Sequence, residues 1–299
     1  MSYHDLRYHE VRFKASHNSF QRREQPVTEQ LHWDPHHPYQ KSGRGVELDL
    51  VQHKNRWRWR VKHDQPYANR CIVRFRFPPF KQNNGMELRD HLEQLNKWSE
   101  EHPGHDVITV HLDLKNAPLS HEEFAERLDS YLLRVIPENK IFAPAALMED
   151  GSDLVTAAMA RGWPKLGELQ GKFIFCLTGK DEERHVGERK KLYADSDAKN
   201  RLCFVDQSMG DGDGGHRPPT DQGNRVFFNY NIFSGKKKWR ETMKWFSRQH
   251  GFVTRGYVAN NKKLWELAVA HGVNVIATDR VSNYEWARVG KQPFEKISS

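Results

Sequence analysis

At 299 residues with 37% hydrophobic and 29% charged residues, the chain can bury a sizeable core, and this balance excludes a disordered or fibrous protein. Its formal net charge of +8 favours anionic partners such as phosphorylated substrates, anionic lipid surfaces or nucleic acid. No apolar run is long enough to cross a membrane and residues 1–20 carry many charges, so we expect a soluble chain without a leader, secreted if one was removed and cytoplasmic otherwise.

Strand-like apolar runs alternate with amphipathic helical stretches along the whole length. The strand-like runs cover residues 10–15, 46–50, 71–75, 107–114, 173–177, 202–205, 226–228, 252–257 and 273–277. The clearest helical stretches cover residues 86–101, 121–135, 237–250 and 261–271. This alternation predicts a mostly parallel sheet covered by helices, and its eight or nine strands favour a closed TIM (β/α)8 barrel. Without an internal repeat or a break in composition, we expect a single domain over residues 1–299.

Two stretches interrupt this pattern. Residues 56–62 alternate Arg and Trp with a period of two, which predicts a hairpin strand that brings His63 to the barrel mouth. Trp57 and Trp59 either pack on the barrel or form an interfacial patch with the neighbouring arginines. The Gly-rich residues 210–219 have no period and predict a loop over the active end.

Polar side chains stand at the ends of several predicted strands. Because the carboxyl ends of parallel strands meet at one mouth, where barrel enzymes place their chemistry, we expect these side chains to converge. They are His17, Asn18, Glu47, Asp49, His63, Asp113 and Lys115. Such a set holds a hard cation by oxygen and still has acid and base groups for cutting a phosphodiester.

Four of these residues offer oxygen ligands. Glu47 and Asp49 are two apart on one strand, so both side chains point to the same face. With the amide of Asn18 and the carboxylate of Asp113 they suit Ca²⁺ or, less easily, Mg²⁺, whereas zinc favours nitrogen or sulfur ligands. Two histidines can then act on opposite sides of the phosphorus, one on its equatorial oxygens and one on the leaving group.

The chain resembles a known family, the calcium-dependent phosphatidylinositol-specific phospholipases C. Within that family it is most similar to the bacterial single-domain members. The matching motifs are residues 16–20, 45–49, 61–63, 107–115, 162–172 and 272–279. The resemblance implies a distorted TIM barrel. It also implies a reaction in which the inositol 2-hydroxyl attacks the adjacent phosphorus and expels diacylglycerol, leaving a cyclic inositol phosphate.

The resemblance also assigns roles to residues. His17 is similar to the group that stabilises the pentacoordinate phosphorus, and His63 to the general acid for the leaving alcohol. Lys115 is similar to a lysine that faces the substrate phosphate. The implied calcium ligands are Asn18, Glu47, Asp49 and Asp113, one of which doubles as the base. The expected partners are a phosphoinositide and a transient anionic membrane surface, with a monomeric protein and no nucleic acid.

Other functions remain as alternatives. A glycerophosphodiester phosphodiesterase shares the barrel, the Glu-x-Asp pair and a His-Asp, but begins with His-Arg where this chain has His17-Asn18. A non-catalytic module that binds anionic lipid headgroups would not need His17 and His63. A nucleic-acid binder rests on the net charge alone. Each motif also has a structural explanation, such as a helix cap or a solvated strand end.

Several further residues have two interpretations. His111 either lines the site or is a hydrogen-bonded core histidine. Asp279 ends the last predicted strand, where it orients a substrate hydroxyl or a histidine, or closes the barrel by hydrogen bonds. Cys71, Cys176 and Cys203 lie in apolar runs without CxxC spacing, which predicts buried free thiols.

Overall fold

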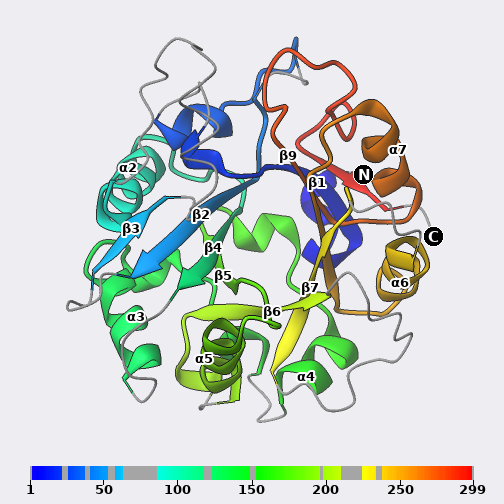
Figure 1. Cartoon of the computed structure of the whole chain (residues 1–299). Coiled ribbons are helices and arrows are strands. Elements are labelled where there is room, and N and C mark those ends of the chain that lie inside the picture. The colour runs from blue at the N-terminus through cyan, green and yellow to red at the C-terminus, as the bar shows by residue number, and fades with distance from the viewer. Residues whose placement is uncertain are drawn as a thin grey trace, which may run out of the picture.

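Ten strands form one continuous sheet in a computed structural model of the chain (Figure 1). The structure describes residues 2–21, 26–37, 41–52, 58–62, 86–116, 123–148, 153–195, 198–209, 224–233 and 238–297. His63, the strand predicted at 71–75, Cys71 and the Gly-rich loop lie outside these residues. The order of strands is β10-β1-β9-β8-β7-β6-β5-β4-β2-β3, and β1 also pairs with β2.

Eight of these strands pair in parallel and close into a barrel. They are β1 (Val11–Ser16), β2 (Gly45–Gln52), β4 (Ile108–Asn116), β5 (Phe173–Thr178), β6 (Cys203–Met209), β7 (Arg225–Asn231), β8 (Val253–Tyr257) and β9 (Val275–Thr278). The seam between β1 and β2 is the pair Ala15–Gly45. A Cβ on Gly45 would lie 2.8 Å from the Cβ of Ala15, so glycine allows this close approach.

Two antiparallel strands extend the barrel sheet. β3 (Trp59–Val61) pairs with β2, and β10 (Phe294–Lys296) pairs with β1. β3 confirms the hairpin strand predicted after the second barrel strand. Trp59 is buried and its ring lies edge-on to Tyr131 at 5.0 Å. This tryptophan therefore packs on the barrel, as one of the two interpretations predicts, while Trp57 lies outside the described residues.

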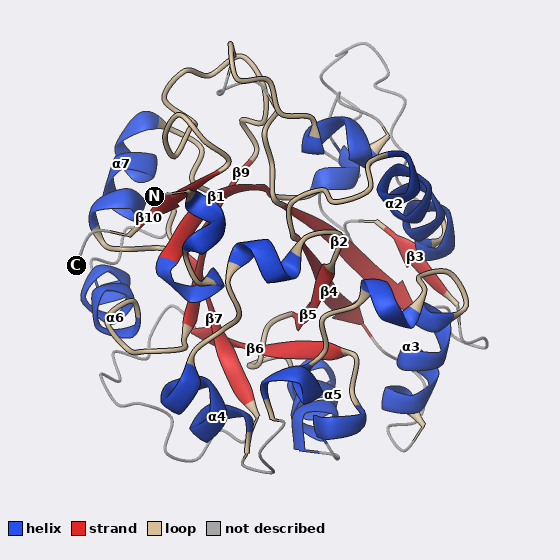
Figure 2. Cartoon of the chain, turned by 180° about the vertical axis from the view of Figure 1, so that it is seen from behind, coloured by secondary structure: helices blue, strands red, loops and turns tan. Residues whose placement is uncertain are grey.

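Helices surround the strands on the outside of the barrel, as both views show (Figures 1 and 2). They are α2 (Leu88–Glu101), α3 (Phe124–Leu133), α4 (Leu154–Arg161), α5 (Arg184–Asp195), α6 (Lys238–Phe246) and α7 (Lys262–Ala270). Short 3-10 helices cover Tyr3–Asp5, Tyr8–Glu10, Ser19–Gln21, Val27–Leu31, Glu138–Lys140, Pro144–Leu147, Leu166–Leu169 and Ala198–Asn200. None of the described helices is both long and apolar enough to cross a membrane.

The structure corrects one of the helices expected from the sequence and adds α4 and α5, which were not among them. The helix expected to reach residue 250 ends at Phe246, because the chain turns before Gly251, whose φ is +82°. α4 was not among the clearest helical stretches, yet Asp153 caps its first turn by accepting from Thr156 N at 2.9 Å. Gly162, with φ +69°, ends it.

Aromatic side chains fill the amino-terminal end of the barrel. Trp163 is buried there, with ring centroids 5.0 Å from Tyr8, 4.8 Å from Phe204 and 5.6 Å from Phe227. Cys176 and Cys203 are free and buried, as predicted. Apolar packing therefore closes one end of the barrel, and the polar side chains gather at the carboxyl ends of the strands.

Candidate active site

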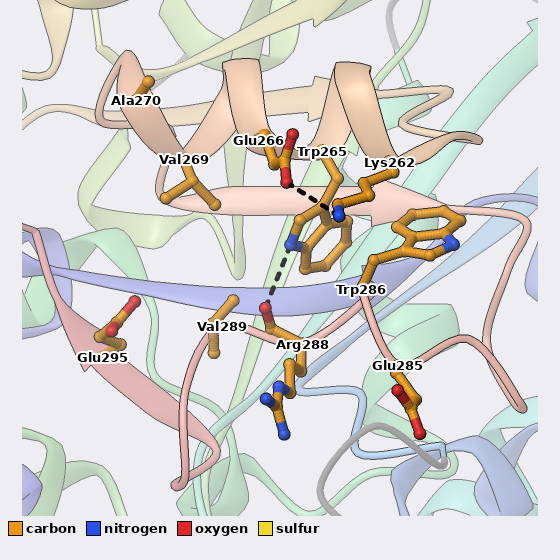
Figure 3. A pocket seen from close by; sticks show the side chains of 10 residues that line it. All are labelled: Lys262, Trp265, Glu266, Val269, Ala270, Glu285, Trp286, Arg288, Val289 and Glu295. Atoms are coloured by element: carbon orange, nitrogen blue, oxygen red, sulfur yellow. Dashed lines mark hydrogen bonds and ion pairs between the residues drawn. The ribbon is translucent and has the colours of Figure 1, made fainter.

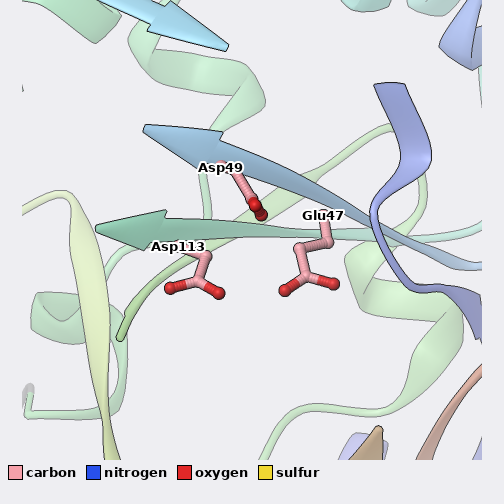
Figure 4. Close-up of side chains that lie close together, drawn as sticks. All are labelled: Glu47, Asp49 and Asp113. Atoms are coloured by element: carbon pink, nitrogen blue, oxygen red, sulfur yellow. The ribbon is translucent and has the colours of Figure 1, made fainter. Parts of the chain in front are cut away.

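Three carboxylates converge at the carboxyl ends of β2 and β4 (Figure 4). Asp49 is paired in register with Asp113 on the neighbouring strand, and Glu47 lies two residues before Asp49 on the same face. One carboxylate oxygen from each of Glu47, Asp49 and Asp113 lies within 4.8 Å of the other two. The strand periodicity in the sequence thus predicts this cluster correctly.

Asn18 joins the cluster from the end of β1. Its φ of +49° is the left-handed conformation that asparagine tolerates, and its backbone N–H donates to Glu47 Oε2 at 3.0 Å. Within the described structure, Asn18 Oδ1 and Asp49 Oδ1 are buried without a hydrogen-bond partner, while Asp49 Oδ2 lies 3.3 Å from the Lys115 ammonium. Buried oxygens left in this state need a donor or a cation, so the donor set fits a hard, oxygen-preferring metal ion.

Lys115 places its ammonium group beside two of these carboxylates. Nζ lies 2.7 Å from Asp113 Oδ2 and 3.3 Å from Asp49 Oδ2. Burial would lower the pKa of Lys115, but Asp113 and Asp49 raise it above its ordinary value. Lys115 therefore stays charged and neutralises part of the carboxylate cluster, in addition to bordering the pocket described below.

The pKa values of the two carboxylates on β2 shift in opposite directions. Burial alone would raise the pKa of Glu47, but Arg255, His17 and Lys115 bring it well below its usual range. For Asp49, burial raises the pKa well above its usual range; Lys115 opposes this shift and the Asp113 carboxylate adds to it. A cation bound at this site would oppose the shift in the pKa of Asp49.

His17 is oriented by a carboxylate from the last barrel strand. Its Nδ1 lies 2.8 Å from Oδ1 of Asp279, and Oδ2 of Asp279 accepts from Asn260 Nδ2 at 2.6 Å. The imidazole stacks on Tyr257, with ring centroids 5.6 Å apart, and its Nε2 lies 3.9 Å from Glu47 Oε2. Of the interpretations of Asp279, orientation of a histidine is the one that the contacts favour.

A cavity of about 330 Å³ opens beside these groups. It is lined by His17, Glu47, Asp113, Leu114, Lys115, Thr178, Gly179, Lys180, Glu183, Ser208, Asn229, Asn231, Arg255, Tyr257 and Val258. Of the residues predicted for the site, His17, Glu47, Asp113 and Lys115 line this pocket. Asn18 and Asp49 do not line it, and His63 lies outside the described residues.

Sequence reasoning missed Arg255, a buried residue of β8. Its Nη2 donates to Glu47 Oε2 at 2.9 Å and its Nη1 to Asn229 Oδ1 at 3.0 Å. The only signal in the sequence is its position two residues before Tyr257, on the same strand face. His111 is a core histidine and not a lining residue, because it is buried below the pocket, where burial lowers its pKa well below the usual range.

A larger groove of about 630 Å³ lies elsewhere, along α7 (Figure 3). Trp265 and Trp286 line it, and Trp265 Nε1 donates to the carbonyl oxygen of Arg288 at 3.1 Å. Its charged side chains, such as the pair Lys262–Glu266 at 3.8 Å, are exposed and lie at its rim. The groove has no cluster of acid, base and metal-ligating groups, so the smaller cavity is the candidate active site.

Comparison with protein families identifies part of the chain. Residues 80–224 match the family described as phosphoinositide phospholipase C, Ca²⁺-dependent. This match covers just under half of the chain. Of the residues that the sequence predicts for the site, Asp113 and Lys115 lie inside it, and His17, Asn18, Glu47, Asp49 and His63 lie outside it. A comparison with curated proteins found no match.

Solved structures resemble the barrel over almost its whole length. A calcium-dependent phosphoinositol-specific phospholipase C from a Pseudomonas species has a TM-score of 0.69 at 19% identity, covering 98% of this chain and 96% of that chain. The Pseudomonas protein has also been solved as a myo-inositol complex. A Ca²⁺-dependent phosphatidylinositol-specific phospholipase C from Streptomyces antibioticus has a TM-score of 0.64 at 17% identity, covering 92% and 95%. An Oleispira antarctica phosphodiesterase has a TM-score of 0.51 at 9% identity, covering 93% and 96%.

The family match and the similar solved structures agree with each other. The resemblance predicted from the motifs is confirmed by the family match, and the relatives in that family are calcium-dependent phospholipase C enzymes. At these identities the likeness to solved structures establishes the fold. The closed TIM-type barrel predicted from the alternation of strands and helices is therefore correct.

Proposed function

We propose that this chain is a calcium-dependent phospholipase C that cleaves phosphatidylinositol to diacylglycerol and a cyclic inositol phosphate. The observation that carries the proposal is the meeting, in one pocket, of an oxygen-rich carboxylate cluster with a histidine supported by Asp279. The family match of residues 80–224 supports calcium as the ion and a phosphoinositide as the substrate.

Asn18, Glu47, Asp49 and Asp113 would hold the calcium ion, since the three carboxylates converge and two oxygens of the set, Asn18 Oδ1 and Asp49 Oδ1, are buried without hydrogen-bond partners. A bound calcium ion neutralises phosphate charge and lowers the pKa of the attacking inositol 2-hydroxyl. One carboxylate of the set accepts the proton of that hydroxyl. Lys115, which borders the same pocket, adds positive charge where the phosphate would bind.

His17 acts on the phosphoryl oxygens. With Nδ1–H donating to Asp279, a protonated imidazole presents its Nε2–H to the pocket, where it stabilises the charge that develops on the pentacoordinate phosphorus. His63 is the proposed general acid, which donates a proton to the departing diacylglycerol oxygen. It lies outside the described residues, so its role rests on the motif Val61-Lys62-His63.

The opposite wall of the pocket suits a polyol headgroup. Hydroxyl and amide side chains from two strands border it, namely Ser208 of β6 and Asn231 of β7. Such groups both donate and accept hydrogen bonds, as the hydroxyls of an inositol ring require. The myo-inositol complex of the Pseudomonas relative supports a ligand of this kind.

A membrane surface is the proposed site of action, with the protein as a monomer. Phe233 follows β7 on the mouth side of the barrel, two residues beyond the pocket residue Asn231, and its side chain is 66% exposed. An exposed aromatic ring beside the pocket can enter the lipid interface while the headgroup enters the cavity.

The proposal is tested with phosphatidylinositol vesicles and with soluble glycerophosphoinositol, each with calcium or with a chelator. We expect a calcium-dependent release of cyclic inositol phosphate from phosphatidylinositol, and its loss in His17→Ala. Cleavage of the soluble diester alone would identify a glycerophosphodiester phosphodiesterase. Binding to the vesicles without any cleavage would identify a headgroup-binding module.

A further inference from the structure

A row of buried polar side chains crosses the barrel from the carboxylate cluster to helix α5. It starts where Glu47 Oε2 accepts from Arg255, whose other terminal nitrogen donates to Asn229. The row continues through Thr178, Asp206 and Lys190. It connects β2 with the far side of the barrel through residues that are distant in sequence.

Asn229 links the two halves of this row. Its Oδ1 accepts from Arg255 Nη1 at 3.0 Å, and its Nδ2 donates to Thr178 Oγ1 at 2.9 Å. The Thr178 hydroxyl in turn donates to Asp206 Oδ2 at 2.5 Å. The side-chain amide can both accept from the guanidinium and donate to the hydroxyl; a carboxylate offers acceptors alone, and an apolar side chain offers neither.

Lys190 anchors the far end of the row. Its fully buried ammonium lies 2.6 Å from Asp206 Oδ1 and 2.9 Å from Asp181 Oδ1, and it donates to the carbonyl oxygen of Gly179 at 2.7 Å. A buried ammonium with three such partners is costly to move, because any displacement leaves a charge unpaired. The end of the row on α5 is therefore fixed.

The near end of the row meets the proposed ion site. Arg255 has a long, flexible side chain, whose terminal nitrogens are held by Glu47 and Asn229 and whose guanidinium lies over the Tyr257 ring at 5.3 Å. Glu47 Oε2 also accepts from Asn18 N at 3.0 Å. Arg255 and Asn18 together fix the orientation of the Glu47 carboxylate relative to Asp49 and Asp113.

We infer that Asn229 is a positioning residue for the calcium site, because its amide holds the Arg255 guanidinium against Glu47 and so fixes that carboxylate for the ion. This inference rests on the proposed function, which supplies the ion. Asn229 acts through Arg255. The amide of Asn229 is itself held by Thr178, which is bonded to Asp206 and through it to the buried Lys190.

The test is a calorimetric titration of the full chain with Ca²⁺ alone, without substrate. In Asn229→Ala the calcium Kd should rise by about tenfold or more, as is usual when support for a metal ligand is lost. Thr178→Val, which keeps the shape and deletes the hydroxyl, should raise it in the same direction by a smaller factor. Thr178→Val also decides the question if Asn229→Ala does not fold.

Asn274 provides a matched control at the opposite end of the barrel. It is a buried asparagine whose Oδ1 accepts from Thr254 N and Oγ1, and whose Nδ2 donates to the carbonyl oxygens of His9 and Val11. Asn274→Ala should lower the melting temperature and leave the calcium Kd unchanged. An equal rise in Kd in this variant would overturn the inference, since general loosening of the barrel would explain both.

The remaining outcomes separate this inference from the proposed function. An unchanged calcium Kd in Asn229→Ala overturns the inference, and a raised KM for phosphatidylinositol with that unchanged Kd identifies Asn229 as a substrate contact instead. If the unaltered chain binds calcium but cleaves no phosphatidylinositol, the proposed function fails while the variants still decide the inference. If the unaltered chain binds no calcium, both fail.

Discussion

The contact between His17 and Asp279 joins the first and last strands of the barrel at the site of the proposed chemistry. Asp279 is itself held by Asn260, so the carboxylate and the imidazole form a fixed pair. A carboxylate on one ring nitrogen selects which nitrogen faces the pocket and places a negative charge beside the ring. The carboxylate therefore contributes through its charge as much as through its shape.

Asp279→Asn keeps the shape of this contact and removes its charge. We expect the turnover number with phosphatidylinositol to fall by about a hundredfold or more, because the amide no longer supports an imidazolium. Steady-state kinetics measure the effect, and thermal unfolding serves as the control, since the variant should melt near the parent temperature. Turnover within a few fold of the parent would show that Asp279 only closes the barrel.

A second prediction concerns Lys115, whose ammonium lies against Asp49 and Asp113. Lys115→Met leaves the carboxylates without this neutralising charge, so the calcium-free protein should be less stable. Calcium should then bind more tightly, by about tenfold or more, because it no longer competes with a neighbouring positive charge. Calorimetry and thermal unfolding with and without calcium measure both effects; weaker calcium binding would contradict the prediction.

At the scale of elements, the carboxyl ends of the strands bring the site together and also define its rim. Phe233 lies just beyond β7 at that rim, whereas Leu192 lies in the last turn of α5 and is 48% exposed. Helices in this barrel run back against the strands, so the last turn of α5 faces the opposite end. Phe233 and Leu192 are therefore exposed apolar side chains at opposite ends of the barrel. Together they test whether the end with the pocket contacts the membrane.

Phe233→Ser should weaken binding to anionic phosphatidylinositol vesicles several fold, because the ring no longer enters the interface. Leu192→Ser removes a similar apolar side chain from the other end and should leave vesicle binding unchanged. Sedimentation of the protein with vesicles measures both. Equal losses in the two variants, or none in either, would contradict the assignment of this rim to the membrane.

At the scale of the whole molecule, buried histidines make stability depend on pH. Burial lowers the pKa of His91, on the apolar face of α2, to about 4, and burial together with His250 lowers that of His9 to about 4. Each is neutral in the folded chain, whereas the unfolded chain takes up a proton near pH 6.5. Their contribution to stability is therefore complete above pH 6.5 and is lost as the pH falls from 6.5 to 4.

His91→Leu tests this dependence. The substitution should reduce the loss of unfolding free energy between pH 6.5 and pH 4 by about 3 kcal/mol, which is the linkage expected for one histidine with this shift. Urea unfolding at a series of pH values measures it. If the parent and the variant lose stability equally over this interval, then His91 does not cause the effect.

Much of the fold and of the carboxylate cluster could be predicted from the sequence because both follow from local periodicity. The two-residue period places Glu47 and Asp49 on one face, and the parallel alternation places Asp113 beside them. Arg255 and Asn229 could not be predicted in the same way. Their contacts depend on which side chains meet across the inside of the closed barrel, and no local pattern encodes that meeting.

The seam of the barrel has one more consequence. β1 and β2 meet at Ala15–Gly45, so the sheet has little pairing to resist opening there. Asn18 lies on one side of the seam and Glu47 on the other, and the backbone N–H of Asn18 donates to the Glu47 carboxylate. An ion bound by both would span the seam, so amide hydrogens near it should exchange more slowly with deuterium when calcium is bound. Calcium binding would then complete the active site and hold the seam of the barrel closed at the same time.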